Sequence, residues 1–321
     1  MNAPGSSRQA PGGALTTEAE PAVEAGGAPS LPDEVVESSS SSVLQMVGRV
    51  FAENRLALVG LVIILLMVLF SFVGPLIYRT DQIDTNLLNA DLAPSSLHLL
   101  GTDPTGYDVL GRLMVGGQSS LEVGFAAAVL ASLWGATWGA VSGSVGGWID
   151  ALMMRVVDSL LAIPPLLLLL LLASIVTPSV PVLIVVIGMT SWLISARLIR
   201  GESLSLRTRE FVQAARVAGG RSPRIVFRHI LPNVVGVIVV QTTFQVANAI
   251  LLLASLSFLG LGPPPPAANW GQMLNDGLNY TYDGYWWLIY PAGFAIVLTV
   301  VAFNLVGDAL SDALNVRLQK R

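Results

Sequence analysis

The sequence predicts an all-α integral membrane protein that crosses the bilayer six times and keeps both termini in the cytoplasm. Three observations lead to this fold class. Of the 321 residues, 53% are hydrophobic and 12% are charged, whereas soluble domains carry about 25% charged residues. Several apolar runs reach the roughly 20 residues that a helix needs to cross a bilayer. Arginines gather in a few polar segments, and such segments beside spans mark the cytoplasmic side.

The N-terminal stretch differs from the rest of the chain in composition. Residues 1–42 are rich in proline, glycine, alanine, serine and glutamate, and they end in a run of serines. This composition cannot bury enough apolar surface to offset the entropy that folding costs. We therefore expect residues 1–42 to be a disordered cytoplasmic tail, either a passive extension or a regulatory segment, and residues 43–321 to form the membrane domain.

Apolar runs supply the predicted spans, which we place at about residues 56–77, 123–145, 156–176, 180–198, 234–259 and 286–306. Arg55 precedes the first span and Asp81 follows it, so the N-terminus is expected inside. The polar stretch 78–118 is then an extracytoplasmic loop. The sixth crossing returns the chain to the cytoplasm, where the basic C-terminal residues end it.

The second predicted span carries glycine at every fourth position, at Gly135, Gly139, Gly143 and Gly147. This spacing places the glycines on one face of a helix. Small residues let helices approach closely in lipid, where packing drives their association. We expect this face to pack against a neighbouring helix rather than to line a pore.

Two charged residues and two prolines mark the third predicted span. Arg155 and Asp158 lie three positions apart and could pair on one helix face. Pro164 and Pro165 lack the backbone N–H that a helix interior needs, so they predict a kink.

The fifth predicted span carries a stripe of amides. Gln241, Gln245 and Asn248 are spaced four and three apart, which places them on one helix face. Amides in hydrocarbon need hydrogen-bond partners. The stripe therefore predicts either hydrogen bonds between helices or the lining of a translocation path, and the sequence does not choose between the two.

The composition excludes several classes of protein. The chain has no cysteine and only two histidines, His98 and His229, which fall in loops on opposite sides of the predicted membrane. A metal site or a nucleophile–histidine pair is therefore not expected, and the chain is not predicted to be an enzyme. The middle of the predicted spans holds no ionisable residue, since Arg155, Asp158 and Asp308 lie towards their inner ends, which disfavours the alternative of an ion-coupled secondary transporter. No nucleic-acid partner is expected.

The loop at residues 199–233 is the long polar segment of an otherwise apolar chain. Eight of the chain's 17 lysine and arginine residues fall between Arg197 and Arg228. Basic residues between two spans are typical of the cytoplasmic side. We therefore expect this loop to face a cytoplasmic partner.

Helix-breaking residues divide that loop into two parts. Residues 210–218 contain neither glycine nor proline and predict a helix, which Gly219–Gly220 would end. Ser222–Pro223 would begin a second helix, and Pro232 would mark its junction with the fifth span. The pattern predicts two short helices around a glycine hinge.

The same loop resembles the cytoplasmic signature of ABC importer permeases. That pattern is Glu-Ala-Ala, three residues, glycine, nine residues, isoleucine, one residue and Leu-Pro. The positions that match it are Ala214, Ala215, Gly219, Leu231 and Pro232. Gln213 stands where the family has glutamate, and His229 stands where it has isoleucine. The form AAR…G…RHILPN is similar to the dipeptide and oligopeptide branch.

Further stretches resemble the same branch, so that the resemblance covers roughly residues 45–321. LLGTDPTGYDVLGRL is similar to its segment after the first span, with Tyr107 in place of arginine and Gly111 in place of serine. LSFLGLGPPPPAANWGQML resembles the end of its fifth span, and FNLVGDALSDALNVRL resembles its C-terminal end.

This resemblance implies the type I importer permease fold and a set of partners. Such a subunit pairs with a homologous permease, sits on one or two ABC ATPase subunits, and receives its substrate from an extracytoplasmic binding protein. ATP and Mg²⁺ would be bound by the ATPases and no cofactor by this chain, which has no phosphate-binding lysine loop. The branch implies di- and oligopeptides as substrates, with nickel complexes or other small solutes as the alternative.

The resemblance also implies which residues contact the ATPase. The loop helix would be the coupling helix, seated in a cleft of an ATPase. The contact within residues 210–232 would involve Glu210, Gln213, Ala214, Ala215, Arg216, Gly219, Leu231 and Pro232.

Overall fold

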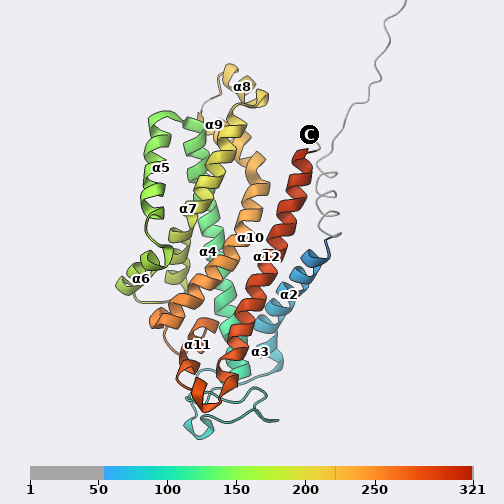
Figure 1. The fold of residues 1–321 in the computed structure, drawn as a ribbon, viewed down its shortest axis with the longest axis vertical. Coiled ribbons are helices and arrows are strands. Elements are labelled where there is room, and N and C mark those ends of the chain that lie inside the picture. The colour runs from blue at the N-terminus through green and yellow to red at the C-terminus, as the bar shows by residue number, and fades with distance from the viewer. Residues whose placement is uncertain (1–53, 221, 320–321) are drawn as a thin grey trace, which may run out of the picture. The chain divides into compact units, whose positions relative to one another are not determined.

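The computed structural model describes residues 54–220 and 222–319, and its elements in these ranges are helices (Figure 1). The all-α prediction is confirmed there, and the predicted tail of residues 1–42 lies outside the described residues. Five of the described helices are long and apolar enough to cross a membrane: Arg55–Ile77, Val109–Val145, Val180–Arg207, Pro223–Leu261 and Trp286–Leu314. A bent pair of helices raises the number to six if the pair counts as one crossing.

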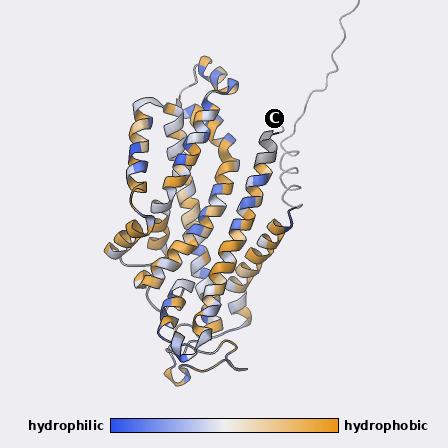
Figure 2. Cartoon of the chain, in the orientation of Figure 1, coloured by the Kyte–Doolittle hydropathy of each residue, from blue (hydrophilic) through white to orange (hydrophobic). Residues whose placement is uncertain are grey.

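The elements follow one another along the chain with few long connections. The α-helices are α2 (Arg55–Phe72), α3 (Gly74–Ile77), α4 (Val109–Val145), α5 (Gly147–Leu161), α6 (Pro165–Ile175), α7 (Val180–Arg207), α8 (Glu210–Val217), α9 (Ser222–Ile225), α10 (Leu231–Leu256), α11 (Trp270–Leu278) and α12 (Tyr290–Gln319). Two π-helical segments, η2 (Val226–Ile230) and η3 (Ser257–Leu261), flank α10, and the 3-10 turns are η1 (Leu87–Asn89), η4 (Thr281–Asp283) and η5 (Trp286–Leu288). Helices α2 and α6 are hydrophobic around most of their surface (Figure 2).

The second span begins earlier than its apolar run. Helix α4 starts at Val109 rather than at residue 123, because the Asp108 carboxylate accepts a hydrogen bond from Gly111 N–H and so caps the helix. The predicted loop 78–118 is therefore wrong beyond Asp108. Arg112, which lies within the predicted loop, is buried: it donates to the carbonyl oxygen of Pro266 at 2.7 Å and stacks on the ring of Tyr107.

The third predicted span is broken rather than kinked. Helices α5 and α6 meet at 85° across Ala162–Pro164. Pro164 has extended backbone angles, because a residue that precedes a proline avoids the helical region, and Pro165 then begins α6. The bend predicted at Pro164–Pro165 is therefore present, but as a break between two helices, and the charged start of the predicted span belongs to α5.

The second helix of the polar loop is not a separate element. Helix α9, η2 and α10 follow one another without a break, so that Pro223–Leu261 is one long helix. Pro232 lies in the first turn of α10, directly after the π-helical turn in which Leu231 N–H donates to the Val226 carbonyl. Proline has no backbone N–H to donate, and the wider π-helical turn before it tolerates the missing hydrogen bond. The prediction of two short helices is therefore correct for the first helix and wrong for the second.

The glycine face of α4 packs against α7, as predicted. A Cβ on Gly135 would lie 2.7 Å from the Trp192 carbonyl oxygen, and one on Gly143 would lie 2.8 Å from that of Arg200. Gly139 packs equally closely on the backbone of Ala196. The fourth glycine departs from this face, because α4 ends at Val145 and Gly147 begins α5.

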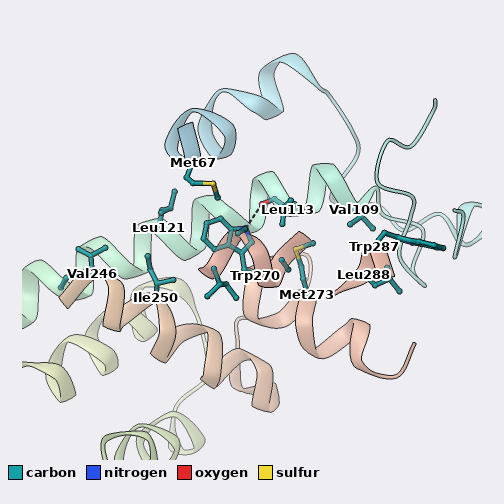
Figure 3. Packing of buried hydrophobic residues seen from close by; sticks show 14 residues of the cluster. Met67, Val109, Leu113, Leu121, Val246, Ile250, Trp270, Met273, Trp287 and Leu288 are labelled. Carbon is teal, nitrogen blue, oxygen red and sulfur yellow. Dashed lines mark hydrogen bonds between the residues drawn. The ribbon is translucent and has the colours of Figure 1, made fainter. Parts of the chain in front are cut away.

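The end of the bundle opposite α8 is built around Trp270, the first residue of α11 (Figures 1 and 3). Trp270 is fully buried, and its indole N–H donates to the Leu113 carbonyl at 2.9 Å. Its backbone N–H donates to Ser120 Oγ at 3.2 Å, so both bonds tie α11 to α4. The surrounding cluster draws on four of the long helices and includes Met67, Leu121, Val246, Ile250 and Ile296.

The segment between α3 and α4 is organised around Asp108, which is 3% exposed. Its Oδ2 accepts the Tyr78 hydroxyl at 2.9 Å and lies 2.9 Å from His98 Nδ1, while its Oδ1 caps α4. Burial, followed by the hydrogen bond to this carboxylate, raises the pKa of the Tyr78 hydroxyl. This end of the molecule is thus fixed by buried polar contacts as well as by apolar packing.

Candidate functional site

Helix α8 stands at one end of the bundle, two residues after α7 (Figure 1). Val212 is fully buried, whereas Val217 is 90% exposed and Phe211 is 42% exposed. Val212 belongs to a cluster with Ala136 and Ala140 of α4 and with Val226 and Ile230 of η2. One buried side chain therefore seats a helix whose remaining surface is largely free.

Most of the predicted contact residues share this exposed helix. Glu210, Gln213, Ala214 and Arg216 are exposed and Ala215 is partly buried, all within the two turns of α8. The remaining predicted residues lie in different surroundings. Gly219 is exposed just beyond the helix, Pro232 is exposed in the first turn of α10, and Leu231 packs against the cluster that holds Val212.

Gly219 ends α8 in a conformation that favours glycine. Its φ is +81°, and a Cβ there would meet no atom within 4 Å. Glycine is therefore favoured by the backbone conformation and not by a lack of room for a side chain. Gly219 N–H donates to the Arg216 carbonyl and Gly220 N–H donates to the Ala215 carbonyl, both at 2.9 Å. This pair of bonds is the Schellman motif, which terminates α8 and satisfies two of its last carbonyls.

The charges of α8 agree with its dipole. Glu210 lies in the first turn and Arg216 in the last, where an acid and a base respectively are favoured. Arg216 Nη2 also lies 3.5 Å from the Ser144 carbonyl oxygen near the end of α4, and Gln213 Nε2 donates to the Thr208 carbonyl at 3.3 Å. The helix is thus held at both ends while its outer face stays open.

The amide stripe of α10 divides between two environments. Gln245 is 4% exposed, and its Nε2 donates to the Ser191 carbonyl at 2.7 Å and to Ser195 Oγ at 3.2 Å. Gln245 therefore links α10 to α7. Gln241 is half-buried and Asn248 is exposed, so the three residues do not form one uniform lining within this chain.

Ion pairs between α5 and α7 were missed or misassigned from the sequence. Asp158 pairs with Arg197 at 2.5 Å rather than with Arg155, and Asp150 forms two bonds of 2.6 Å with Arg200. The spacing of Arg197 and Arg200, one turn apart in the half of α7 nearer α8, was the available indication, but the break between α5 and α6 had to be known to place the acids opposite them. Among the residues that the structure describes, no group of three acidic, histidine or cysteine side chains could hold a metal ion.

Comparison with known proteins identifies the family. Residues 135–320 match the family described as "Binding-protein-dependent transport system inner membrane component". Residues 42–94 match the N-terminal TM domain of oligopeptide transport permease C.

Individual relatives match nearly the whole chain. The oligopeptide transport system permease protein OppC of Bacillus subtilis is 42% identical over 270 residues, which cover 84% of this chain and 88% of the relative. OppC of Escherichia coli K12 is 42% identical over 284 residues, with 88% and 94% covered. The dipeptide transport system permease protein DppC of Bacillus subtilis is 39% identical over 285 residues, with 89% of each chain covered.

These matches agree with the apolar helices in describing a multi-pass membrane protein. Each matched relative is a permease by name, and the match extends from the first span to α12. The chain therefore belongs to the family of binding-protein-dependent transport system inner membrane components, as an ABC importer permease subunit that is not itself an enzyme.

Proposed function

We propose that this chain and a homologous permease form a translocation path for di- and oligopeptides, and that cytoplasmic ATPases drive the pair through α8. The observation that carries the proposal is the exposed α8, on which Ala214 and Ala215, followed by Gly219, keep the spacing of the permease signature. Two small residues allow a partner to approach the helix backbone closely. The names of the relatives, which are oligopeptide and dipeptide permeases, support the peptide cargo.

The proposed topology has six crossings, with the α5–α6 pair as the third, and both termini in the cytoplasm. Charge supports this orientation. The segments opposite α8, residues 78–108 and 262–285, contain Arg79 as their one arginine or lysine among seven aspartates. The opposite end carries the arginines that flank α8, so α8 is placed on the cytoplasmic side.

In the proposed assembly, which sits in membrane lipid, this chain has three kinds of partner protein. A second permease completes the path, one or two types of ATPase subunit bind ATP and Mg²⁺ beneath the pair, and an extracytoplasmic binding protein delivers the substrate. Closure of the ATPases on ATP moves α8. Because Val212 seats α8 against α4 and η2, the movement reaches the spans and turns the path from inward- to outward-facing.

Within the path, we assign different roles to the amides of α10. Gln245 holds α10 to α7 and serves the structure of the bundle. Asn248 is exposed and Gln241 is half-buried in the isolated chain, so these two are available to a substrate or to the second permease.

The coupling role is tested by Gly219→Pro in the reconstituted transporter. Proline cannot adopt the φ of +81° found at Gly219, so α8 loses its termination and both uptake and ATPase stimulation should be abolished while membrane insertion continues. Gly284→Pro is the matched control, because Gly284 has a φ of +87° with equally open surroundings at the opposite end. Wild-type uptake by Gly219→Pro would refute the role of α8.

The cargo is tested separately. The complex is purified with its binding protein, and that protein is titrated with di- and tetrapeptides and with nickel chelates by calorimetry. Saturable peptide binding is expected. Binding of a nickel chelate without binding of any peptide would replace the cargo and leave the coupling role untouched.

A further inference from the structure

The turn between α4 and α5 is held by an ion pair between a buried carboxylate and a partly exposed arginine. Both oxygens of Asp150 accept from Arg200 of α7, from Nε and from Nη2, each at 2.6 Å. Ser142 of α4 donates its hydroxyl to the same carboxylate. Asp150 and Arg200 side chains are 12% and 32% exposed. We call these three residues the α4–α5 joint; it fastens three helices at one point.

Two more arginines converge on this turn. The Arg207 guanidinium, at the end of α7, lies directly over Gly146, where a Cβ would collide with it. Arg216 of α8 reaches the Ser144 carbonyl. The last carbonyls of α4 carry the negative end of its dipole and lack helical partners, so cations are favoured here. Helix α8 thus contacts the same turn that the joint fixes to α7.

A second ion pair between α5 and α7 provides a contrast. Arg197 and Asp158 lie 2.5 Å apart, but their side chains are 57% and 56% exposed. An exposed pair with a single contact contributes little and is easily rearranged. A bidentate pair with a buried carboxylate fixes both distance and orientation, and breaking it leaves a charge without its partner.

We propose that Asp150 and Arg200 are positioning residues for transport, which pass the displacement of α8 and α7 to the broken span α5–α6. This inference rests on the proposed coupling role of α8. Helix α5 continues into α6 through the 85° bend, so a shift of α5 at the joint relocates α6. The joint is the rigid point at which α4, α5 and α7 meet beside α8.

The test separates transport from ATP hydrolysis. Asp150→Asn removes the charge and half of the bidentate pairing, and Asp158→Asn is the matched control on the same helix, facing the same partner helix. In proteoliposomes with the ATPases and binding protein, peptide uptake per ATP hydrolysed should fall about tenfold in Asp150→Asn, as for a typical coupling energy. Asp158→Asn should stay within about twofold of wild type. Complex assembly, measured by size exclusion, and ATPase activity should both be retained.

Each outcome bears on the proposal. Equal uptake in the two variants overturns it, and so does a parallel loss of uptake and ATPase activity in a complex that assembles normally, because uptake per ATP hydrolysed is then unchanged. If Asp150→Asn does not assemble, Arg200→Lys, which keeps the charge and loses the fork, is assayed in the same way, and normal uptake per ATP then overturns the proposal. Gly219→Pro is run in parallel. If Gly219→Pro is active, the coupling role of α8 fails; if it is inactive and Asp150→Asn is normal, the joint alone fails.

Discussion

The two ends of the bundle are built in opposite ways. At the α11 end, Trp270 is fully buried, Asp108 is 3% exposed, and both make hydrogen bonds to distant parts of the chain. At the other end, Val212 is the one buried side chain of α8, while Val217 beside the helix terminus is 90% exposed. The α11 end has a buried core that its own chain completes, although Leu88 and Tyr282 are exposed there, whereas α8 is seated by a single side chain.

This difference indicates how force enters the molecule. Segments with few buried contacts open or shift at low free-energy cost, whereas densely buried segments move as units. A helix seated by one valine can follow a partner, provided that rigid contacts beneath it carry the movement onward. Under the proposed coupling role of α8, the α11 end is the frame against which the other end would be displaced.

Trp270→Ala should show the fixed end most clearly. Removing a fully buried tryptophan costs about 3–5 kcal/mol, and it leaves the Leu113 carbonyl without its donor. The apparent melting temperature of the purified complex should therefore fall sharply, as measured by intrinsic fluorescence or light scattering. Trp286→Ala, at a position 50% exposed, is the control and should change it little. Similar melting of the two variants would contradict a frame centred on Trp270.

Asp108→Ala should produce the next largest loss. It removes the cap of α4 and the acceptor of Tyr78 and His98. A lost cap costs about 0.5–2 kcal/mol and each of the two lost hydrogen bonds about 1 kcal/mol, so about 2.5–4 kcal/mol is expected. Amide hydrogen exchange should localise the loss to residues 78–112. Asp84→Ala, an exposed aspartate of the same segment, is the control, and equal exchange in both variants would refute the role of Asp108 as the organising residue.

Local patterns in the sequence were sufficient for some features of both ends. The four-residue spacing of Gly135, Gly139 and Gly143 predicted the contact with α7, and the glycines after residue 218 predicted where α8 ends. Each is encoded within one or two helical turns. The residues of α8 proposed for coupling could be grouped for the same reason, because they are neighbours on one short helix.

Features that depend on a distant partner could not be predicted. The start of α4 was misplaced because residues 109–122 lie outside the apolar run, and the carbonyl that accepts from buried Arg112 comes from Pro266, far along the chain. Asp150 pairs with Arg200, and Asp158 pairs with Arg197 instead of its neighbour Arg155. Both pairs form because α5 is a separate helix that lies along α7. Gln245 and Asn248 share a helix face, yet only Gln245 has α7 beside it. In each case the sequence supplied a polar residue, and the tertiary fold decided its partner.

Val217→Ser should have the smallest effect on stability and is the sharpest test of the open end. Val217 is 90% exposed, and a surface substitution usually changes stability by less than about 0.5 kcal/mol. If the free face of α8 is covered by an ATPase, the same change removes apolar area from that contact, so the affinity of the ATPase for the permease should fall while the melting temperature stays constant. Both are measured on one preparation, by pull-down titration and by thermal melting.

Val212→Ser is the companion variant. Val212 packs against Ala136 and Ile230, so a serine there should loosen the packing of α8 on the bundle and lower uptake. If the Val217→Ser permease binds its ATPases with normal affinity, Val217 is not part of their contact. The contact would then lie elsewhere on α8, at Ala214 or Gln213.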